Sequence, residues 1–116
     1  MGNYNQAIVT SGTRTLYASG QIGLIPGKEG LGVVGDVARQ TEQVMDNLAA
    51  VLEAAGMSFE NVARATIYLA NMGDFKTVDE IYGRRFKPGT HPARATIQAA
   101  ALPKEALVEI DVVAVA

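Results

Sequence analysis

The chain of 116 residues contains no cysteine and no tryptophan. The absence of cysteine excludes disulfides, thiolate nucleophiles, iron–sulfur clusters and zinc sites built on cysteine. A single histidine, His91, leaves too few imidazole ligands for an ordinary histidine metal centre. We therefore expect a protein without a metal site, and a cysteine-free chain fits a reducing compartment.

The chain also lacks a large excess of positive or negative charge. Ten basic and twelve acidic side chains give a formal net charge of −2, so no basic field attracts nucleic acid or an anionic membrane. No uninterrupted apolar run is long enough to span a bilayer, and the start MGNYNQAIV lacks the basic region and apolar core of a signal peptide. We expect a cytoplasmic protein with neither a membrane nor a nucleic-acid partner.

Glycines at positions 30, 32 and 35 spell the G-x-G-x-x-G string of dinucleotide-binding turns. That string binds a pyrophosphate only where a buried strand enters the first glycine and a helix begins after the last one. Here residues 26–29, Pro-Gly-Lys-Glu, precede the first glycine and are typical of a turn. We therefore interpret the segment as a loop that leads into a capped helix.

The first half of the chain predicts a hairpin followed by a helix. Two β-rich runs, QAIVT and TLYASGQIGL, lie within residues 6–24 on either side of a turn at residues 11–14. Asp36 is placed to cap a helix over residues 37–55, because its side chain can accept hydrogen bonds from the first free amides. Apolar residues recur there at helical spacing, and Gly56 can end the helix in a left-handed conformation.

The second half predicts strand, helix and two more strands. Residues 61–70 alternate between apolar and polar side chains, which indicates a strand with one apolar face. Asp74 is expected to cap a second helix that Pro88 and Gly89 end. Two strands follow, around residues 93–101 and 106–115, joined by a turn at residues 102–104. This order predicts an α+β fold, a single domain over residues 1–116, with both helices on one face of the sheet.

The last strand is apolar on both of its faces. Ile110 and Val112 lie on one face, while Val113 and Val115 lie on the other. Two helices can cover only one face of the sheet, and an exposed apolar sheet face promotes association. We therefore expect another subunit to cover the second face.

Arg94 and Glu109 are single charges within the two C-terminal strands. A charge on a covered sheet costs free energy unless it is paired or used. One interpretation is an Arg94–Glu109 ion pair, or a guanidinium bonded to a neighbouring subunit. Another is a site in which Arg94 binds a substrate carboxylate with its planar fork, while Glu109 orients a water molecule or moves a proton. The residues alone leave both interpretations open.

Other candidate residues carry weaker signals. His91 precedes a proline in a turn-like segment, where a solvent-facing side chain is expected. Ser19 has no histidine near it in the sequence to activate its hydroxyl. Tyr4 and Tyr17 could each supply a phenol, but a tyrosine on a half-buried strand ordinarily serves packing.

Four segments, in their order and spacing, resemble the Rid family of reactive-intermediate deaminases, also called the YjgF family. They are SGQIG, NMGDFKTVDEIY, PARATIQ and ALPKEALVEIDVVAVA. The resemblance covers nearly the whole chain, and its most specific parts are P-A-R and L-P-K followed by V-E-I.

The resemblance implies a fold and an activity. The expected subunit is similar to that of a small trimeric chorismate mutase, with a mixed sheet, helices outside, and three subunits whose sheets form a central barrel. The expected reaction is hydrolysis of enamines and imines, such as 2-aminoacrylate and 2-iminobutyrate, to 2-keto acids and ammonia in clefts between subunits, without a metal or organic cofactor. A non-catalytic trimer that binds small carboxylates, and a macromolecular role in translation, RNA cleavage or chaperoning, stay open as alternatives.

The resemblance also assigns roles to residues of this chain. Arg94 matches the arginine that binds the substrate carboxylate, and Glu109 matches the acid that positions the hydrolytic water. Ser19 falls at the family's cleft serine, and Tyr4 at the tyrosine of its N-terminal G-P-Y-S-Q motif. Asparagines replace the proline and the serine of that motif here, and Asp79 stands where asparagine is usual. These differences make the substrate range an open question.

Overall fold

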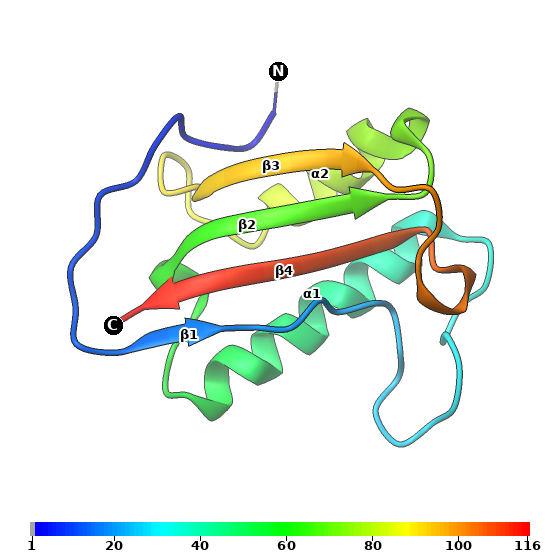
Figure 1. Cartoon of the computed structure of the whole chain (residues 1–116), viewed down its shortest axis with the longest axis horizontal. Helices are drawn as coiled ribbons and strands as arrows, with labels where there is room; N and C mark the ends of the chain where they lie inside the picture. Colours follow the sequence, from blue (N-terminus) through cyan, green and yellow to red (C-terminus); the bar gives the residue numbers. More distant parts are fainter. Residues whose placement is uncertain (1) are drawn as a thin grey trace.

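One sheet and one pair of helices form two layers in the computed structural model, which describes residues 2–116 (Figure 1). Three short 3₁₀ turns connect these elements. In chain order, the helices and strands are β1 (Thr15–Tyr17), α1 (Val37–Ala54), β2 (Val62–Leu69), α2 (Phe75–Gly83), β3 (Ala93–Gln98) and β4 (Val108–Val115).

The sheet is mixed, with the strand order β1-β4-β2-β3. Strand β4 runs antiparallel to both β1 and β2, whereas β2 and β3 are parallel. Parallel neighbours require a crossover connection, and α2 lies within the segment that connects β2 to β3. The register places Ala65 opposite Arg94 and Ile67 opposite Ile110, which fixes the face on which each side chain lies.

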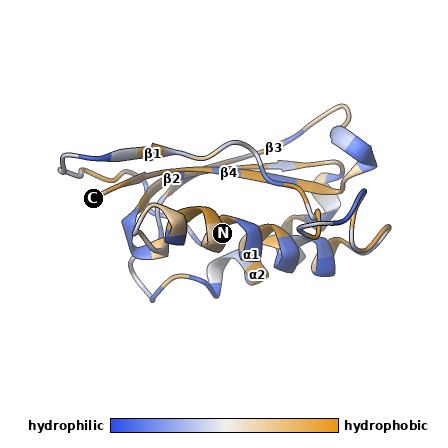
Figure 2. Cartoon of the chain, turned by 90° about the horizontal axis from the view of Figure 1, so that it is seen from below, coloured by the Kyte–Doolittle hydropathy of each residue, from blue (hydrophilic) through white to orange (hydrophobic). Residues whose placement is uncertain are grey.

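Both helices lie on one side of the sheet, as the side view shows (Figure 2). The core forms between the two layers, where alternate residues of β2 and β4 meet the apolar stripe of α1. Its fully buried members include Val44, Leu48, Leu52, Ala65, Ile67, Leu69, Val108, Ile110 and Val112. The prediction that both helices cover one sheet face is confirmed. Among residues 2–116, no helix is long and apolar enough to cross a membrane.

Helix α1 begins at Val37 as the sequence predicts and ends at Ala54, one residue before the predicted end. The Asp36 side chain accepts a hydrogen bond from the backbone N–H of Arg39 at 3.1 Å. At the other end, Gly56 has a φ of +73°, and the N–H of Met57 donates to the carbonyl of Leu52. This is the Schellman arrangement, in which a left-handed residue lets the chain turn back and bond the last carbonyls of the helix.

The predicted N-terminal hairpin is wrong. Of residues 6–24, only β1 is a strand, and β1 pairs with β4 rather than with residues 6–10. Residues 7–14 are exposed, and Val9 is 100% exposed. β-Branched residues favour a strand through packing against cross-strand neighbours. The segment QAIVT has no such neighbour in the described chain, so its β propensity does not produce a strand.

The prediction that Asp74 caps the second helix is also wrong. The Asp74 side chain makes no capping hydrogen bond. Instead, Asn71 Oδ1 accepts from the backbone N–H of Gly73 at 2.8 Å and caps a 3₁₀ turn, Met72–Asp74, that continues directly into α2. Helix α2 ends at Gly83, before the predicted Pro88, although Phe86 beyond it is still buried.

Tyr82 of α2 is fully buried, and its hydroxyl has no hydrogen-bond partner among residues 2–116. Burial raises its pKa well above the usual value. Because an unpaired buried hydroxyl is unfavourable, we expect Tyr82→Phe to leave the free energy of unfolding at neutral pH unchanged or to raise it by up to about 1 kcal/mol. Urea unfolding of both proteins measures this difference.

The raised pKa of Tyr82 also gives a pH dependence. The folded-state pKa lies above the unfolded value of about 10, so this side chain's contribution to stability is complete below about pH 10 and is lost as the pH rises toward the folded-state pKa. Tyr82→Phe should therefore lose less stability than the wild type between neutral pH and about pH 11. Marked destabilisation of the variant at neutral pH would show that the hydroxyl has a hydrogen-bond partner in the folded protein, and a larger alkaline loss in the variant would contradict the raised pKa of Tyr82.

Candidate functional site

Arg94 lies near the start of β3 and points toward the helix layer. Its side chain is only 4% exposed and pairs with Asp79 of α2, with 2.5 Å between Nη1 and Oδ1. Glu109 is paired in register with Tyr68, on the other face of the sheet from Ala65 and Arg94. The Arg94–Glu109 ion pair that the sequence left open is therefore not formed within the chain, because successive side chains of a strand point to opposite faces.

Aromatic rings surround the Arg94 guanidinium. Its central carbon lies 5.5 Å from the ring centroid of Tyr4 and 5.4 Å from those of Phe75 and Tyr82. Phe75, Asp79 and Tyr82 follow one another at intervals of four and three residues, so they share one face of α2. Rings at this distance favour a cation, and their apolar bulk excludes water from around the guanidinium.

Residues 2–5, called the N-terminal segment below, cover this arginine. The backbone N–H of Asn3 donates to Asp79 Oδ1 at 3.0 Å, and its side-chain amide donates to Asp79 Oδ2 at 3.2 Å and to the Asp79 carbonyl at 3.0 Å. Asn5 forms a parallel bridge with Ala93, next to Arg94. The structure thus brings Tyr4 to Arg94, two residues that the resemblance assigned to one site.

Glu109 lies on the face of the sheet that points away from the helices, called the open face below. Its side chain packs against the backbone of Gly20. A Cβ atom at position 20 would overlap the Glu109 carboxylate. Only glycine at this position therefore allows the carboxylate to occupy its observed position. Ser19 is exposed beside this glycine, and the bridge between Gln21 and Ile110 holds the segment against β4. The structure thus brings Ser19 close to the Glu109 strand.

The open face around Glu109 is acidic. Tyr68, which lies opposite Glu109 in register, has a raised pKa. The main cause is the negative charge of Asp111, and burial and the charge of Glu109 add to it. A proton on this face is therefore held more tightly by its phenol than in water.

The candidate residues form two groups, one on each face of the sheet. Arg94 and Tyr4 lie on the helix face and edge, and Glu109 with Ser19 lies on the open face. One small substrate cannot contact both groups of a single chain, because the sheet lies between them. If both groups serve one reaction, they come from two different chains.

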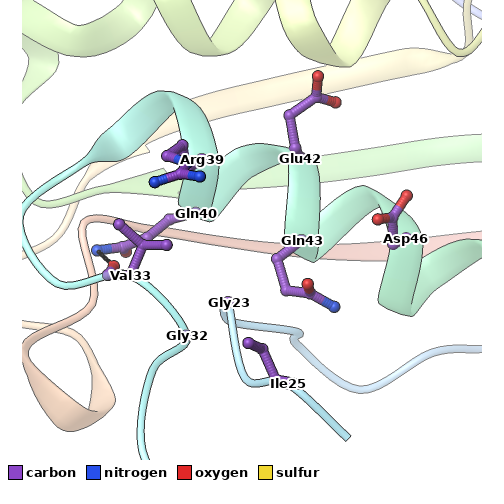
Figure 3. Close-up of a pocket in the computed structure, with 9 residues that line it drawn as sticks. All are labelled: Gly23, Ile25, Gly32, Val33, Arg39, Gln40, Glu42, Gln43 and Asp46. Carbon is purple, nitrogen blue, oxygen red and sulfur yellow. Dashed lines mark hydrogen bonds between the residues drawn. The ribbon is translucent and has the colours of Figure 1, made fainter.

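A separate hollow of about 290 Å³ lies beside the first turns of α1 (Figure 3). The glycine string borders it: Gly32 packs against Ile25, and the Gln40 amide donates to the carbonyl of Val33 at 2.9 Å. The same side chain accepts from the N–H of Leu107 at 2.9 Å. No named strand enters Gly30 among residues 2–116, so the interpretation of this motif as a loop is confirmed. In the same range, no group of three or more acidic or histidine side chains is placed to hold a metal ion.

Comparison with known proteins shows the family to which the chain belongs. The model of the family described as Endoribonuclease L-PSP matches residues 1–116. The chain belongs to this family, also known as the Rid or YjgF family.

Individual members of the Rid family resemble the chain over nearly all of its length. Protein DfrA of Myxococcus xanthus is 49% identical over 115 residues, which cover 99% of this chain and 86% of that relative. The human 2-iminobutanoate/2-iminopropanoate deaminase is 46% identical over 115 residues, which cover 99% of this chain and 81% of that relative. The crystal structure of RidA from an Antarctic Psychrobacter superimposes with a TM-score of 0.82 at 36% identity, covering 99% of this chain and 89% of that one. The mixed sheet with two helices on one face is therefore the Rid-family fold.

Sequence reasoning missed most of the surroundings of Arg94. Asp79 was noted only as a departure from the family's usual asparagine, not as the ion-pair partner of Arg94, and neither Phe75 nor Tyr82 was assigned to the site. Their helical spacing with Asp79 was a usable signal, because it places all three on one face of α2. No local pattern indicates that Asn3 binds Asp79, since these residues are 76 positions apart.

His91 serves packing at the end of α2 in this Rid-family chain. Its ring lies 5.7 Å from that of Phe86, and its Nε2 lies 3.3 Å from the carbonyl of Gly83. The side chain is half-buried rather than solvent-facing.

Proposed function

We propose that the chain hydrolyses reactive 2-imino acids and their enamine tautomers, such as 2-iminobutyrate and 2-aminoacrylate, to 2-keto acids and ammonia. The observation that carries this proposal is the enclosed guanidinium of Arg94, which already binds a carboxylate, that of Asp79. A site that holds one carboxylate in an apolar surrounding suits a small substrate with the same group. The printed activity of the human relative, an imine deaminase, supports this reaction class.

Hydrolysis of the imine requires only positioning of the substrate and water, together with proton transfer. Water adds to the imine carbon, and one of its protons passes to the nitrogen to give a carbinolamine. The hydroxyl proton of the carbinolamine then moves to the amine as the C–N bond breaks, which releases ammonia and leaves the keto acid. In this scheme Arg94 binds and orients the substrate carboxylate. Glu109 accepts the proton of the attacking water and returns it to the leaving nitrogen. Ser19 and Tyr4 complete the site by contacting substrate, and orientation of reactants supplies the remaining acceleration.

The two groups act together in a homotrimer whose clefts lie between neighbouring subunits. The open sheet face carries apolar side chains that a neighbour would cover: Tyr17 is 79% exposed and Ile97 is 47% exposed. In each cleft, Arg94 and Tyr4 of one subunit meet Glu109 and Ser19 of the next. This arrangement accounts for a catalytic pair that the sheet separates within each chain.

The test generates 2-aminoacrylate and 2-iminobutyrate in place with a dehydratase and follows the appearance of keto acid with and without the protein. We expect faster keto-acid formation with the protein. Binding of 2-ketobutyrate without acceleration would instead support a carboxylate-binding protein. Because the family description names an endoribonuclease, a parallel reaction contains RNA, and cleavage that survives repurification and depends on Glu109 would favour a macromolecular role.

A further inference from the structure

We propose that Asp79 is an internal competitor for the substrate carboxylate, so that this residue sets the affinity of the site for 2-imino acids. The inference rests on the function proposed above, and it concerns the ligand that Arg94 holds when no substrate is bound.

One terminal nitrogen of the Arg94 guanidinium, Nη1, is occupied, and the other, Nη2, is covered by the N-terminal segment. Nη1 donates to Asp79 Oδ1 and lies 3.4 Å from the carbonyl oxygen of Asn3. The Nη2 atom lies so close to Gly2 that a Cβ atom there would be 2.6 Å from it. A substrate carboxylate that used the planar fork of this guanidinium would have to take the position of the Asp79 carboxylate or of the N-terminal segment.

Asp79 also holds the cover in place. Three hydrogen bonds from Asn3 end on Asp79, two of them on its carboxylate oxygens. The N-terminal segment and the arginine are thus tied to the same carboxylate, whose side chain is only 13% exposed. When an incoming carboxylate displaces Asp79 from Arg94, the hydrogen bonds that hold the segment change with it, so covering and substrate binding compete.

The hollow beside this ion pair has a volume of about 440 Å³ and is lined by Gly2, Asn3, Phe75, Lys76, Asp79 and Glu80. Two of these side chains are carboxylates, which disfavour an anion in the hollow, and one, Lys76, is a cation that favours it. Of the two carboxylates, only Asp79 forms an ion pair with Arg94 among residues 2–116. We therefore assign the competition to Asp79 and use Glu80 as the comparison.

The decisive variant is Asp79→Asn, which keeps the shape and one acceptor oxygen but removes the charge. When only a fraction of the protein is in the binding-competent state, the apparent Kd equals the intrinsic Kd divided by that fraction. We expect Asp79→Asn to bind 2-ketobutyrate, a stable carboxylate probe, about tenfold to a hundredfold more tightly in calorimetry, as loss of one charge-assisted competing bond implies. With 2-iminobutyrate the KM should fall by a similar factor while kcat changes little.

The matched control is Glu80→Gln, which makes the same change in net charge on an exposed neighbour of the same helix. Its affinity for 2-ketobutyrate should rise much less than that of Asp79→Asn, because Glu80 lines the hollow but forms no ion pair with Arg94 within the described chain. A second variant, Asn3→Ala, removes the side-chain bonds of the N-terminal segment while leaving Asp79 in place, and we expect an affinity gain of a few-fold.

Unchanged or weaker 2-ketobutyrate binding by a folded Asp79→Asn protein would overturn the inference. If that variant does not fold, unchanged binding by Asn3→Ala overturns it. The calorimetric readout is independent of turnover. Tighter binding by Asp79→Asn with no imine hydrolysis by any variant would uphold the competition and reject the proposed reaction.

Discussion

Replacing Arg94 by alanine is expected to lower kcat/KM for 2-iminobutyrate hydrolysis by up to about a hundredfold, because a charge-assisted bidentate bond contributes up to about 3 kcal/mol. Arg94→Lys should recover only part of this loss, since lysine keeps the charge but lacks the planar fork. Keto-acid formation under dehydratase coupling measures both variants, with the exposed Arg84→Ala as the control cation. Wild-type rates in Arg94→Ala would remove this residue from substrate binding.

The same substitution should destabilise the protein, and this effect must be separated from the loss of activity. Arg94→Ala leaves the Asp79 carboxylate without its partner in a site where the two side chains are 4% and 13% exposed. Breaking a buried pair in this way costs about 3–5 kcal/mol, whereas replacing both charges is often neutral. The double variant Arg94→Met/Asp79→Asn should therefore regain stability in urea unfolding but not activity. Recovery of both would show that the single variant was inactive only because it unfolded.

Replacing Glu109 by glutamine is expected to lower kcat by about 10²–10⁴-fold, the usual contribution of a positioned general base, with a small change in KM. Glutamine has nearly the same shape, so packing against Gly20 is kept while the capacity to accept a proton is lost. The control is Asp111→Asn, an acid two residues further along β4 on the same face of the sheet. Melting temperatures of the two variants establish that both fold.

A different result for Glu109→Gln would assign this residue another role. If KM rose while kcat stayed at the wild-type value, Glu109 would bind substrate rather than move a proton. If Asp111→Asn lost as much activity as Glu109→Gln, the general acidity of this face, which already raises the pKa of Tyr68, would be the cause.

Local patterns predicted most of the fold. Helix α1 follows from a capping aspartate, an apolar stripe and a terminal glycine, all of which act within a few residues. Strands β2 and β4 follow from alternation of side chains, which needs no knowledge of their partners. The N-terminal hairpin failed because strand formation depends on a neighbour, and β1 pairs with β4, almost 100 residues further along the chain.

The candidate site was harder to predict from the sequence than the fold. The family resemblance assigned Arg94, Glu109, Tyr4 and Ser19 to one cleft, but no local pattern shows on which face of the sheet each lies. That information is in the register, Ala65 opposite Arg94 and Tyr68 opposite Glu109, which long-range pairing fixes. The separation of the two charges by the sheet therefore emerged only from the structure, whereas the family resemblance had already implied clefts between subunits.

The central claim is that each site takes Arg94 from one subunit and Glu109 from its neighbour, and complementation tests it most directly. Arg94→Ala and Glu109→Gln proteins, each inactive alone, are unfolded together, refolded as a one-to-one mixture and assayed with 2-iminobutyrate. In a randomly mixed trimer about one quarter of the clefts join an intact Arg94 to an intact Glu109, so we predict about one quarter of the wild-type activity. Mixed trimers, verified by mass spectrometry, that stay as inactive as their parents would contradict the account.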